Sequence, residues 1–270
     1  MIYTLTLNPA LDYVVKTEEF LPGELNRMDS EQLFVGGKGI NVSRVLKTLG
    51  VSSTAMGFVA GFTGKEIEEV LIKEGIKTDF VKLVEGNSRI NIKIKSGQET
   101  ELNGKGPKVD TSAKEQLFEK LDSLEKGDIL IMSGSSANGL SNNIYAEIMQ
   151  SLEGKDVKFV VDASGELLKK ALCFKPWLIK PNKQELEQFF DCRIESADQA
   201  LIYAKRFLEY GAKNILLSLA KTERYLLTVR KMHTKSQCLL EKCSTRLAQG
   251  IRWLRDFWQD AACMKSTRTD

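Results

Sequence analysis

The sequence predicts an α/β protein in which a mainly parallel β-sheet is covered by helices on both faces. Short apolar segments alternate with helical stretches along most of the chain, and this alternation is typical of a parallel sheet. The chain has 270 residues, of which 42% are hydrophobic and 28% charged, a globular composition. This length fits one large α/β domain or two ordinary domains. Residues 13–34 and 87–104 break the alternation, and we expect them to form a small second sheet that acts as a lid.

The first half of the chain holds elements separated by Gly, Pro or Asn, the usual residues of turns. Strands are expected at residues 1–7, 54–59 and 87–95, and helices at 40–49 and 62–71. In the last of these strands isoleucines alternate with polar residues. We therefore expect a half-exposed antiparallel strand on which Arg89 faces outward.

The second half repeats a strand–helix unit, because apolar runs of β-strand length are followed by segments of helical period. Strands are expected at residues 128–132, 159–161, 177–179 and 214–219, and helices at 115–125, 141–153, 184–190 and 197–210.

The composition excludes several classes of site. His233 is the single histidine, so a multi-histidine metal cage is excluded. The five cysteines include no Cys-X-X-Cys pair, which favours free thiols in a reducing compartment. Because no apolar run approaches the ~20 residues of a membrane helix and no signal peptide is recognisable, we expect a cytoplasmic protein without a membrane partner.

Polar residues follow the first strand and precede the first helix. Asp12 comes just after the first strand, where it could accept hydrogen bonds from sugar hydroxyls or simply cap a turn. Gly36, Gly37, Lys38 and Asn41 form a glycine-rich turn at a helix start, which suits a phosphorylated or hydroxyl-rich ligand. It is not a P-loop, because no Ser or Thr follows the lysine; a tight turn is the simpler alternative.

Two further groups allow a structural and a functional interpretation. Arg89 and Arg27 lie in the two lid segments and could clamp a phosphate together with a lysine, although an isolated surface arginine is commonly just solvated. Asn182 and Glu185 follow an apolar strand and could hold a water-rich Mg²⁺ near nucleotide phosphates. They fit equally well as an N-cap with an acidic first turn.

Taken together, five segments in order are distinctive. They are Thr-Leu-Asn-Pro-Ala-Leu-Asp at 6–12, Gly-Gly-Lys-Gly-Ile-Asn-Val-Ser-Arg at 36–44, Thr-Glu-Leu-Asn-Gly-Lys-Gly-Pro at 100–107, Val-Asp-Ala-Ser-Gly at 161–165 and Lys-Pro-Asn-Lys-Gln-Glu at 180–185. Over residues 1 to about 220 the chain resembles the PfkB/ribokinase family of carbohydrate kinases, and most of all its members that act on fructose 1-phosphate. The family's tagatose-6-phosphate kinases are the nearest alternative, although Asn103-Gly104 favours the fructose enzymes.

The resemblance implies a ribokinase-like three-layer α/β/α fold and phosphoryl transfer from ATP, with Mg²⁺, to fructose 1-phosphate. It also implies a homodimer formed through the lid. The implied roles are sugar binding for Asp12, Gly36, Gly37 and Asn41, phosphate binding for Lys38, Arg89 and Arg27, Mg²⁺ binding for Asn182 and Glu185, and contact with the nucleotide for Lys180 and Ser218.

The C-terminal region departs from the family pattern. The family has a glycine-rich loop after the strand at 214–219 and then a Gly-Ala-Gly-Asp segment whose Asp is the general base, and neither occurs here. Residues 221–270 carry 11 Lys and Arg against 5 Asp and Glu, whereas residues 1–220 carry 28 against 31. We therefore divide the chain into a kinase domain, 1–220, and an aberrant basic tail, 221–270, that replaces the nucleotide-binding region.

Our hypothesis for the origin of this tail is a one-base frameshift near Lys221. Residues 245–259 can be encoded by codons that, regrouped by one base, read Asn-Ser-Val-Gly-Ala-Gly-Asp-Ser-Met-Val-Ala-Gly-Phe-Leu-Ala. Ile251 then occupies the place of the general base and cannot take a proton. We therefore expect a kinase by descent whose activity in this chain is impaired.

Two alternatives of other classes remain. The chain could be a sugar-phosphate-binding pseudokinase that keeps the ligand site without the chemistry. The basic tail could instead be an amphipathic helix or a nucleic-acid-binding arm. The nucleic-acid alternative ranks last, since residues 1–220 have no basic excess, and we expect no nucleic-acid partner.

Overall fold

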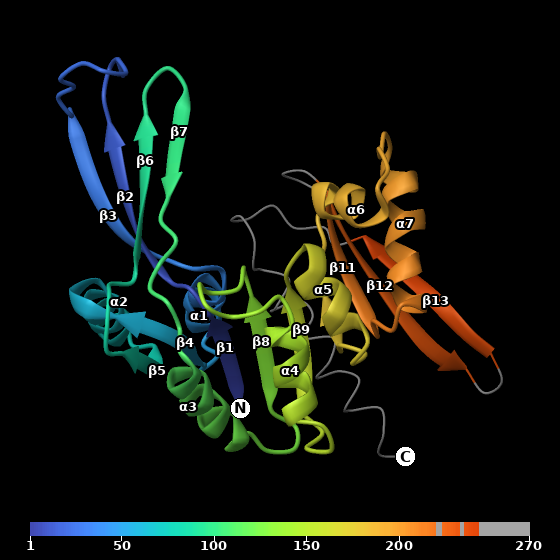
Figure 1. Ribbon diagram of the computed structural model, residues 1–270. Helices are drawn as coiled ribbons and strands as arrows, with labels where there is room; N and C mark the ends of the chain where they lie inside the picture. Colours follow the sequence, from blue (N-terminus) through green and yellow to red (C-terminus); the bar gives the residue numbers. More distant parts are fainter. Residues whose placement is uncertain (220–222, 233–234, 243–270) are drawn as a thin grey trace.

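The computed structural model describes residues 1–219, 223–232 and 235–242 (Figure 1). Its larger sheet has the strand order β13-β12-β11-β10-β9-β8-β1-β4-β5. All neighbouring strands from β11 to β5 pair in parallel. β12 pairs antiparallel with β11, and β13 pairs antiparallel with β12. Their bounds are Ile2–Thr6 for β1, Thr54–Ala60 for β4, Lys77–Leu83 for β5, Ile129–Ser133 for β8, Lys158–Asp162 for β9, Leu178–Ile179 for β10, Asn214–Leu219 for β11, Glu223–Met232 for β12 and Lys235–Lys242 for β13. The predicted mainly parallel sheet is confirmed.

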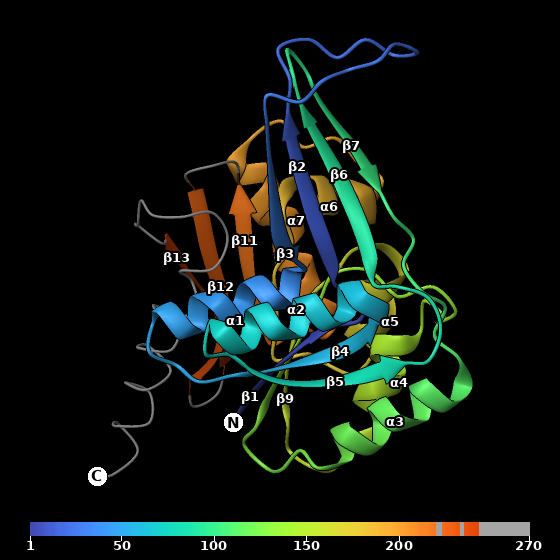
Figure 2. The ribbon, with the colours of Figure 1, turned by 90° about the vertical axis from the view of Figure 1, so that its left-hand side faces the viewer.

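Helices cover the two faces of this sheet (Figure 2). On one face α1 (Lys38–Thr48) and α2 (Gly61–Lys73) pack, with Val42 and Leu46 of α1 in a cluster with Ile131. The other face is covered by α3 (Thr111–Asp122), α4 (Ile144–Ser151), α5 (Gly165–Leu172), α6 (Lys183–Phe190) and α7 (Ala197–Glu209). The layers are therefore α/β/α. Among these helices, α5 is absent from the sequence prediction.

The predicted small second sheet is confirmed, although residues 17–29 of the first predicted lid segment form a loop; its role as a lid stays a prediction. Its order is β3-β2-β6-β7, with β2 at Ala10–Lys16, β3 at Ser30–Gly36, β6 at Arg89–Lys95 and β7 at Glu99–Asn103. It rises from the edge of the main sheet at which the parallel strands end (Figures 1 and 2). The expected polarity of β6 is partly wrong: Arg89, expected to face outward, is half-buried, and Asn91 is only 6% exposed, whereas Ile90 is 42% exposed. The polar face of β6 turns inward because it faces Asp12 of β2.

The start of the basic tail is part of the main sheet. β12 pairs antiparallel with β11, and β13 pairs with β12, so residues 223–232 and 235–242 are strands and not an amphipathic helix. Both strands, like β5, are missing from the sequence prediction. Most of the proposed frameshifted segment, Ile251 included, lies outside the described residues, and the division at residue 220 stays a prediction. No described helix is long and apolar enough to cross a membrane.

Candidate active site

The site begins where the first strand of the main sheet meets the lid. β1 ends at Thr6, and β2 then carries Asp12 beside β3, whose last residue is Gly36. A Cβ atom placed on Gly36 would lie 2.9 Å from Oδ2 of Asp12, and Gly37 has a φ of +137°. Glycine is needed at Gly36 for this close approach and at Gly37 for its backbone conformation. The structure therefore brings Asp12 and the glycine-rich turn together, as the sequence analysis expected.

A pocket of about 550 Å³ opens beside this turn. From the predicted set, Gly37, Lys38 and Arg89 line it. The other lining residues are Thr6, Asn8, Ser133, Gly134, Ser135, Ser136, Asn142, Ala163, Ser164, Glu166 and Leu167. The loop after β8 and the start of α5 thus belong to the site, and the sequence analysis did not assign them to it.

The pocket is cationic on two sides and has helix N-termini nearby. Arg89 is half-buried, and its Nε has no hydrogen-bond partner among the described residues. Burial lowers the pKa of Arg89, and the charge of Asp12 opposes this shift. Helix α1 begins at Lys38, and its N-cap residue, Gly37, has no side chain to cap it; the N–H of Ile40 donates to Oγ1 of Thr6 at 3.1 Å, and the first turn has no acidic residue. An anion bound here would meet Lys38, Arg89 and free backbone N–H donors.

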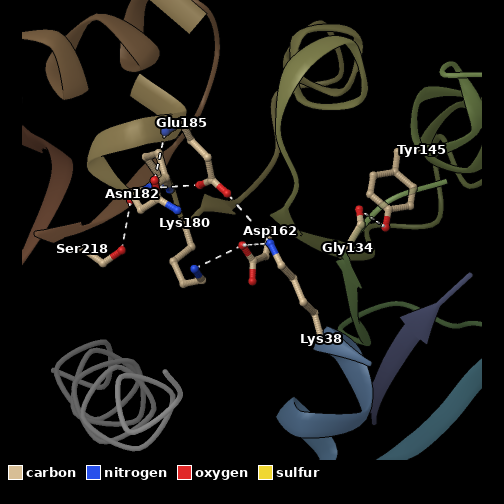
Figure 3. A network of polar contacts seen from close by, with 9 residues as sticks. Lys38, Gly134, Tyr145, Asp162, Lys180, Asn182, Glu185 and Ser218 are labelled. Carbon is tan, nitrogen blue, oxygen red and sulfur yellow. Dashed lines mark hydrogen bonds and ion pairs between the residues drawn. The ribbon is translucent and has the colours of Figure 1, made fainter. Parts of the chain in front are cut away.

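The loop after β8 is fixed by a buried tyrosine. The hydroxyl of Tyr145 donates to the carbonyl oxygen of Gly134 at 3.2 Å, and the N–H of Gly134 donates to the carbonyl oxygen of Asp162 at 3.0 Å (Figure 3). Tyr145 is 0% exposed. Burial, with a further contribution from the charge of Asp162, raises its pKa. The hydroxyl therefore stays protonated and holds the pocket wall in place.

A second polar cluster extends the site toward β11 (Figure 3). Nζ of Lys38 lies 3.9 Å from Oδ1 of Asp162 and 3.8 Å from Oε1 of Glu185. Nζ of Lys180 lies 3.1 Å from the same oxygen of Asp162, which is buried and makes no hydrogen bond within the described part of the chain. Asp162 therefore lies in the candidate site, a position that the motif at 161–165 did not predict.

The Asn182–Glu185 pair forms a capping box at the start of α6. Oδ1 of Asn182 accepts from the N–H of Glu185, and Oε2 of Glu185 accepts from the N–H of Asn182, both at 2.9 Å. Ser218 lies beside this cap, and its N–H donates to the carbonyl oxygen of Pro181 at 3.0 Å. The described residues contain no cluster of three or more His, Cys, Asp or Glu that could hold a metal ion. Asn182 is therefore the N-cap of α6, with Glu185 in the first turn, as one of the two interpretations expected. The metal-binding role of the two residues stays a prediction.

Four of the residues predicted to bind the sugar or its phosphate do not line the pocket: Asp12, Arg27, Gly36 and Asn41. Asp12 and Gly36 lie against each other beside it. Arg27 is exposed on the loop between β2 and β3, and Asn41 is exposed on α1, where its N–H donates to the carbonyl oxygen of Gly37 at 2.9 Å. Neither lines the pocket, and their roles stay predictions.

The family can now be assigned, because residues 5–239 match the pfkB family of carbohydrate kinases. The chain is a PfkB family carbohydrate kinase. It is 43% identical over 228 residues to the 1-phosphofructokinase of Bacillus subtilis, covering 84% of this chain and 75% of that enzyme. It is 44% identical over 220 residues to the 1-phosphofructokinase of Borreliella burgdorferi, covering 81% and 71%. It is 40% identical over 222 residues to the D-tagatose-1-phosphate kinase of Bacillus licheniformis, covering 82% and 73%.

Solved structures of this family have the same fold. Phosphofructokinase-2 from Escherichia coli in complex with fructose-6-phosphate superposes with a TM-score of 0.81 at 26% identity, covering 92% of this chain and 80% of that one. The tetrameric inhibited form of the same enzyme gives a TM-score of 0.78 at 27% identity, covering 88% and 78%. This PfkB kinase is therefore a phosphotransferase of the sugar-phosphate kinase group, with the ribokinase-like fold that the sequence predicts. The family is ATP-dependent.

Proposed function

We propose that this PfkB kinase binds fructose 1-phosphate and, in its intact form, phosphorylates it with ATP to give fructose 1,6-bisphosphate. The observation that carries the proposal is that Lys38 and Arg89 line one pocket beside the Asp12 carboxylate, which lies against Gly36. The two cations and the N-terminus of α1 would bind the phosphate of the sugar. Asp12 would accept hydrogen bonds from two sugar hydroxyls.

ATP and Mg²⁺ would bind on the β11 side of the pocket. The carboxylates of Glu185 and Asp162 flank Lys38, and carboxylate oxygens suit a cation that keeps several of its waters. Mg²⁺ would neutralise charge on the nucleotide phosphates. Lys180, Asn182 and Ser218 lie close by and would contact or frame the nucleotide.

The sequence of this chain predicts impaired turnover, because it lacks the Gly-Ala-Gly-Asp segment. Loss of a general base costs about 10²–10⁴ in rate, and loss of anion-hole donors costs about 10²–10³. The test is isothermal titration with fructose 1-phosphate together with a coupled assay for ATP-dependent turnover, with the Bacillus subtilis enzyme as reference. We expect saturable binding and turnover at least about 10³-fold lower. Absence of binding would overturn the substrate assignment, and near-normal turnover would overturn the impairment.

Two other functions share this site. A kinase for a tagatose phosphate is favoured by the 40% identity to the Bacillus licheniformis enzyme, and parallel titration with fructose and tagatose phosphates separates the two. A pseudokinase would be stabilised by fructose 1-phosphate but not by Mg-ATP in a thermal-shift titration. Fructose 1-phosphate and ATP are small cytoplasmic metabolites, and we therefore propose that the protein is cytoplasmic.

The lid offers a surface for a homodimer. Leu33, Tyr13, Ile92 and Leu102 occupy one row across its four strands, and Leu33 and Leu102 are more than half exposed. One relative, phosphofructokinase-2 from Escherichia coli, has a tetrameric form. We propose that two copies pair through this row, because such apolar faces are rarely left in water. Sedimentation of Leu102→Lys should show a monomer where the unaltered chain sediments as a dimer.

A further inference from the structure

The lid strand β6 supplies a separate donor to each oxygen of the Asp12 carboxylate. Asn91 is opposite Asp12 in the β2–β6 register, and its Nδ2 donates to Oδ1 of Asp12 at 2.8 Å. Nζ of Lys93 lies 3.3 Å from Oδ2. Because an ionised carboxylate only accepts hydrogen bonds, this contact also fixes which way the Asn91 amide points.

The carboxylate has little freedom to move from this position. Asn91 is 6% exposed, and the side chain of Asp12 is 19% exposed. Gly36 of β3 closes the opposite side, since even a Cβ atom there would lie within 3.1 Å of both carboxylate oxygens. The orientation of Asp12 is therefore set by β6 on one side and by β3 on the other.

Lys93 contacts both Asp12 and the outer strand of the lid, β7. Its Nζ also lies 3.9 Å from Oε1 of Glu101 on β7, directly across the β6–β7 register. Its side chain is 29% exposed, and it does not line the pocket that contains Arg89. Lys93 thus faces the Asp12 carboxylate and not the expected phosphate position.

We propose that Lys93 and Asn91 are positioning residues of the sugar site, which hold the Asp12 carboxylate in the orientation that accepts sugar hydroxyls. This inference rests on the proposed binding of fructose 1-phosphate. Arg89, Asn91 and Lys93 then share one face of β6 with two tasks: Arg89 meets the phosphate, and the next two polar residues orient Asp12. The lid is in this way part of the recognition of the sugar ring.

The test is a double-mutant cycle on the full chain, read as the Kd for fructose 1-phosphate by isothermal titration. Lys93→Met should weaken binding about tenfold, which is within the coupling measured for contacting residues. Lys93→Arg should restore most of the affinity. Asn91→Leu, which keeps the side-chain volume, should weaken binding in the same way. Lys95→Met is the matched control: Lys95 lies on the same face of β6, is exposed, and should change Kd less than twofold.

The cycle separates positioning from direct attraction of the phosphate. In an Asp12→Asn background, Lys93→Met should have no further effect on Kd. An equal loss in both backgrounds would show that Lys93 acts on the ligand directly, and an unchanged Kd in Lys93→Met would show that it does not act at all; either result overturns the inference alone. Absence of fructose 1-phosphate binding by the unaltered chain would overturn the proposed function and this inference together.

Discussion

Asp12 and Gly36, which are 24 positions apart in the chain, lie in contact at the base of the lid. The Asp12 carboxylate occupies the volume that a side chain at Gly36 would take. β2 and β3 bring them together, because the antiparallel register places Ala10 opposite Gly36. The position of the Asp12 carboxylate, which we propose binds the sugar, thus depends on the absence of one Cβ atom.

Gly36→Ala should therefore displace the Asp12 carboxylate and weaken fructose 1-phosphate binding by about tenfold or more, since small displacements at a binding site cost orders of magnitude. Isothermal titration measures the effect. Gly97→Ala is the control, because a Cβ on Gly97 meets nothing within 4 Å. Equal affinities of the two variants would contradict a role for this contact.

Tyr145→Phe should leave the carbonyl oxygen of Gly134 without its side-chain donor. Loss of one partner of a buried hydrogen bond costs about 1–3 kcal/mol, so the free energy of unfolding in urea should fall by that amount. Affinity for fructose 1-phosphate should fall with it, because the loop lines the pocket. Tyr3→Phe, at the far end of β1, serves as the comparison and should leave affinity unchanged.

Glu185 has two roles that substitution can separate. Glu185→Gln keeps an acceptor for the N–H of Asn182, so the free energy of unfolding should change by less than about 0.5 kcal/mol. The same variant removes the charge that faces Lys38, and stabilisation by Mg-ATP should be lost in a thermal-shift titration. Glu185→Ala should lose the stabilisation by Mg-ATP and also the cap, and loss of the cap should lower the free energy of unfolding by about 1 kcal/mol. Retained Mg-ATP stabilisation in Glu185→Gln would argue against a metal role.

Acid should weaken the contact between α3 and α4 through Glu147. Its hydrogen bond with Lys114 lowers the pKa of Glu147, burial opposes this, and Ser141 adds a second lowering hydrogen bond. A carboxylate with a lowered folded pKa contributes stability above its unfolded pKa of about 4.3 and loses it as the pH falls through the folded value. Urea unfolding from pH 7 to pH 3 should therefore show a smaller acid loss for Glu147→Gln than for the unaltered chain. Glu115→Gln, an exposed position on α3, should follow the unaltered chain.

The frameshift hypothesis predicts a specific DNA sequence. The gene should hold, in an alternative frame downstream of codon 221, a segment that encodes Gly-Ala-Gly-Asp. Expression of the chain with the frame restored should recover ATP-dependent turnover of fructose 1-phosphate. A gene with no family segment in any other frame would refute the hypothesis.

The sequence by itself determined the fold class, the glycine-rich turn and the family, because hydrophobic period and ordered motifs are local properties of the chain. Tertiary structure alone decided that Asn91 is buried while Ile90 is exposed, and that Ser135, Asp162 and Lys93 lie around the site. It also decided that the chain after β11 pairs as β12 and β13. Strand register and helix packing bring together residues that are distant in sequence. A sequence pattern describes only neighbours along the chain, so it could not show that the polar face of β6 meets Asp12 of β2.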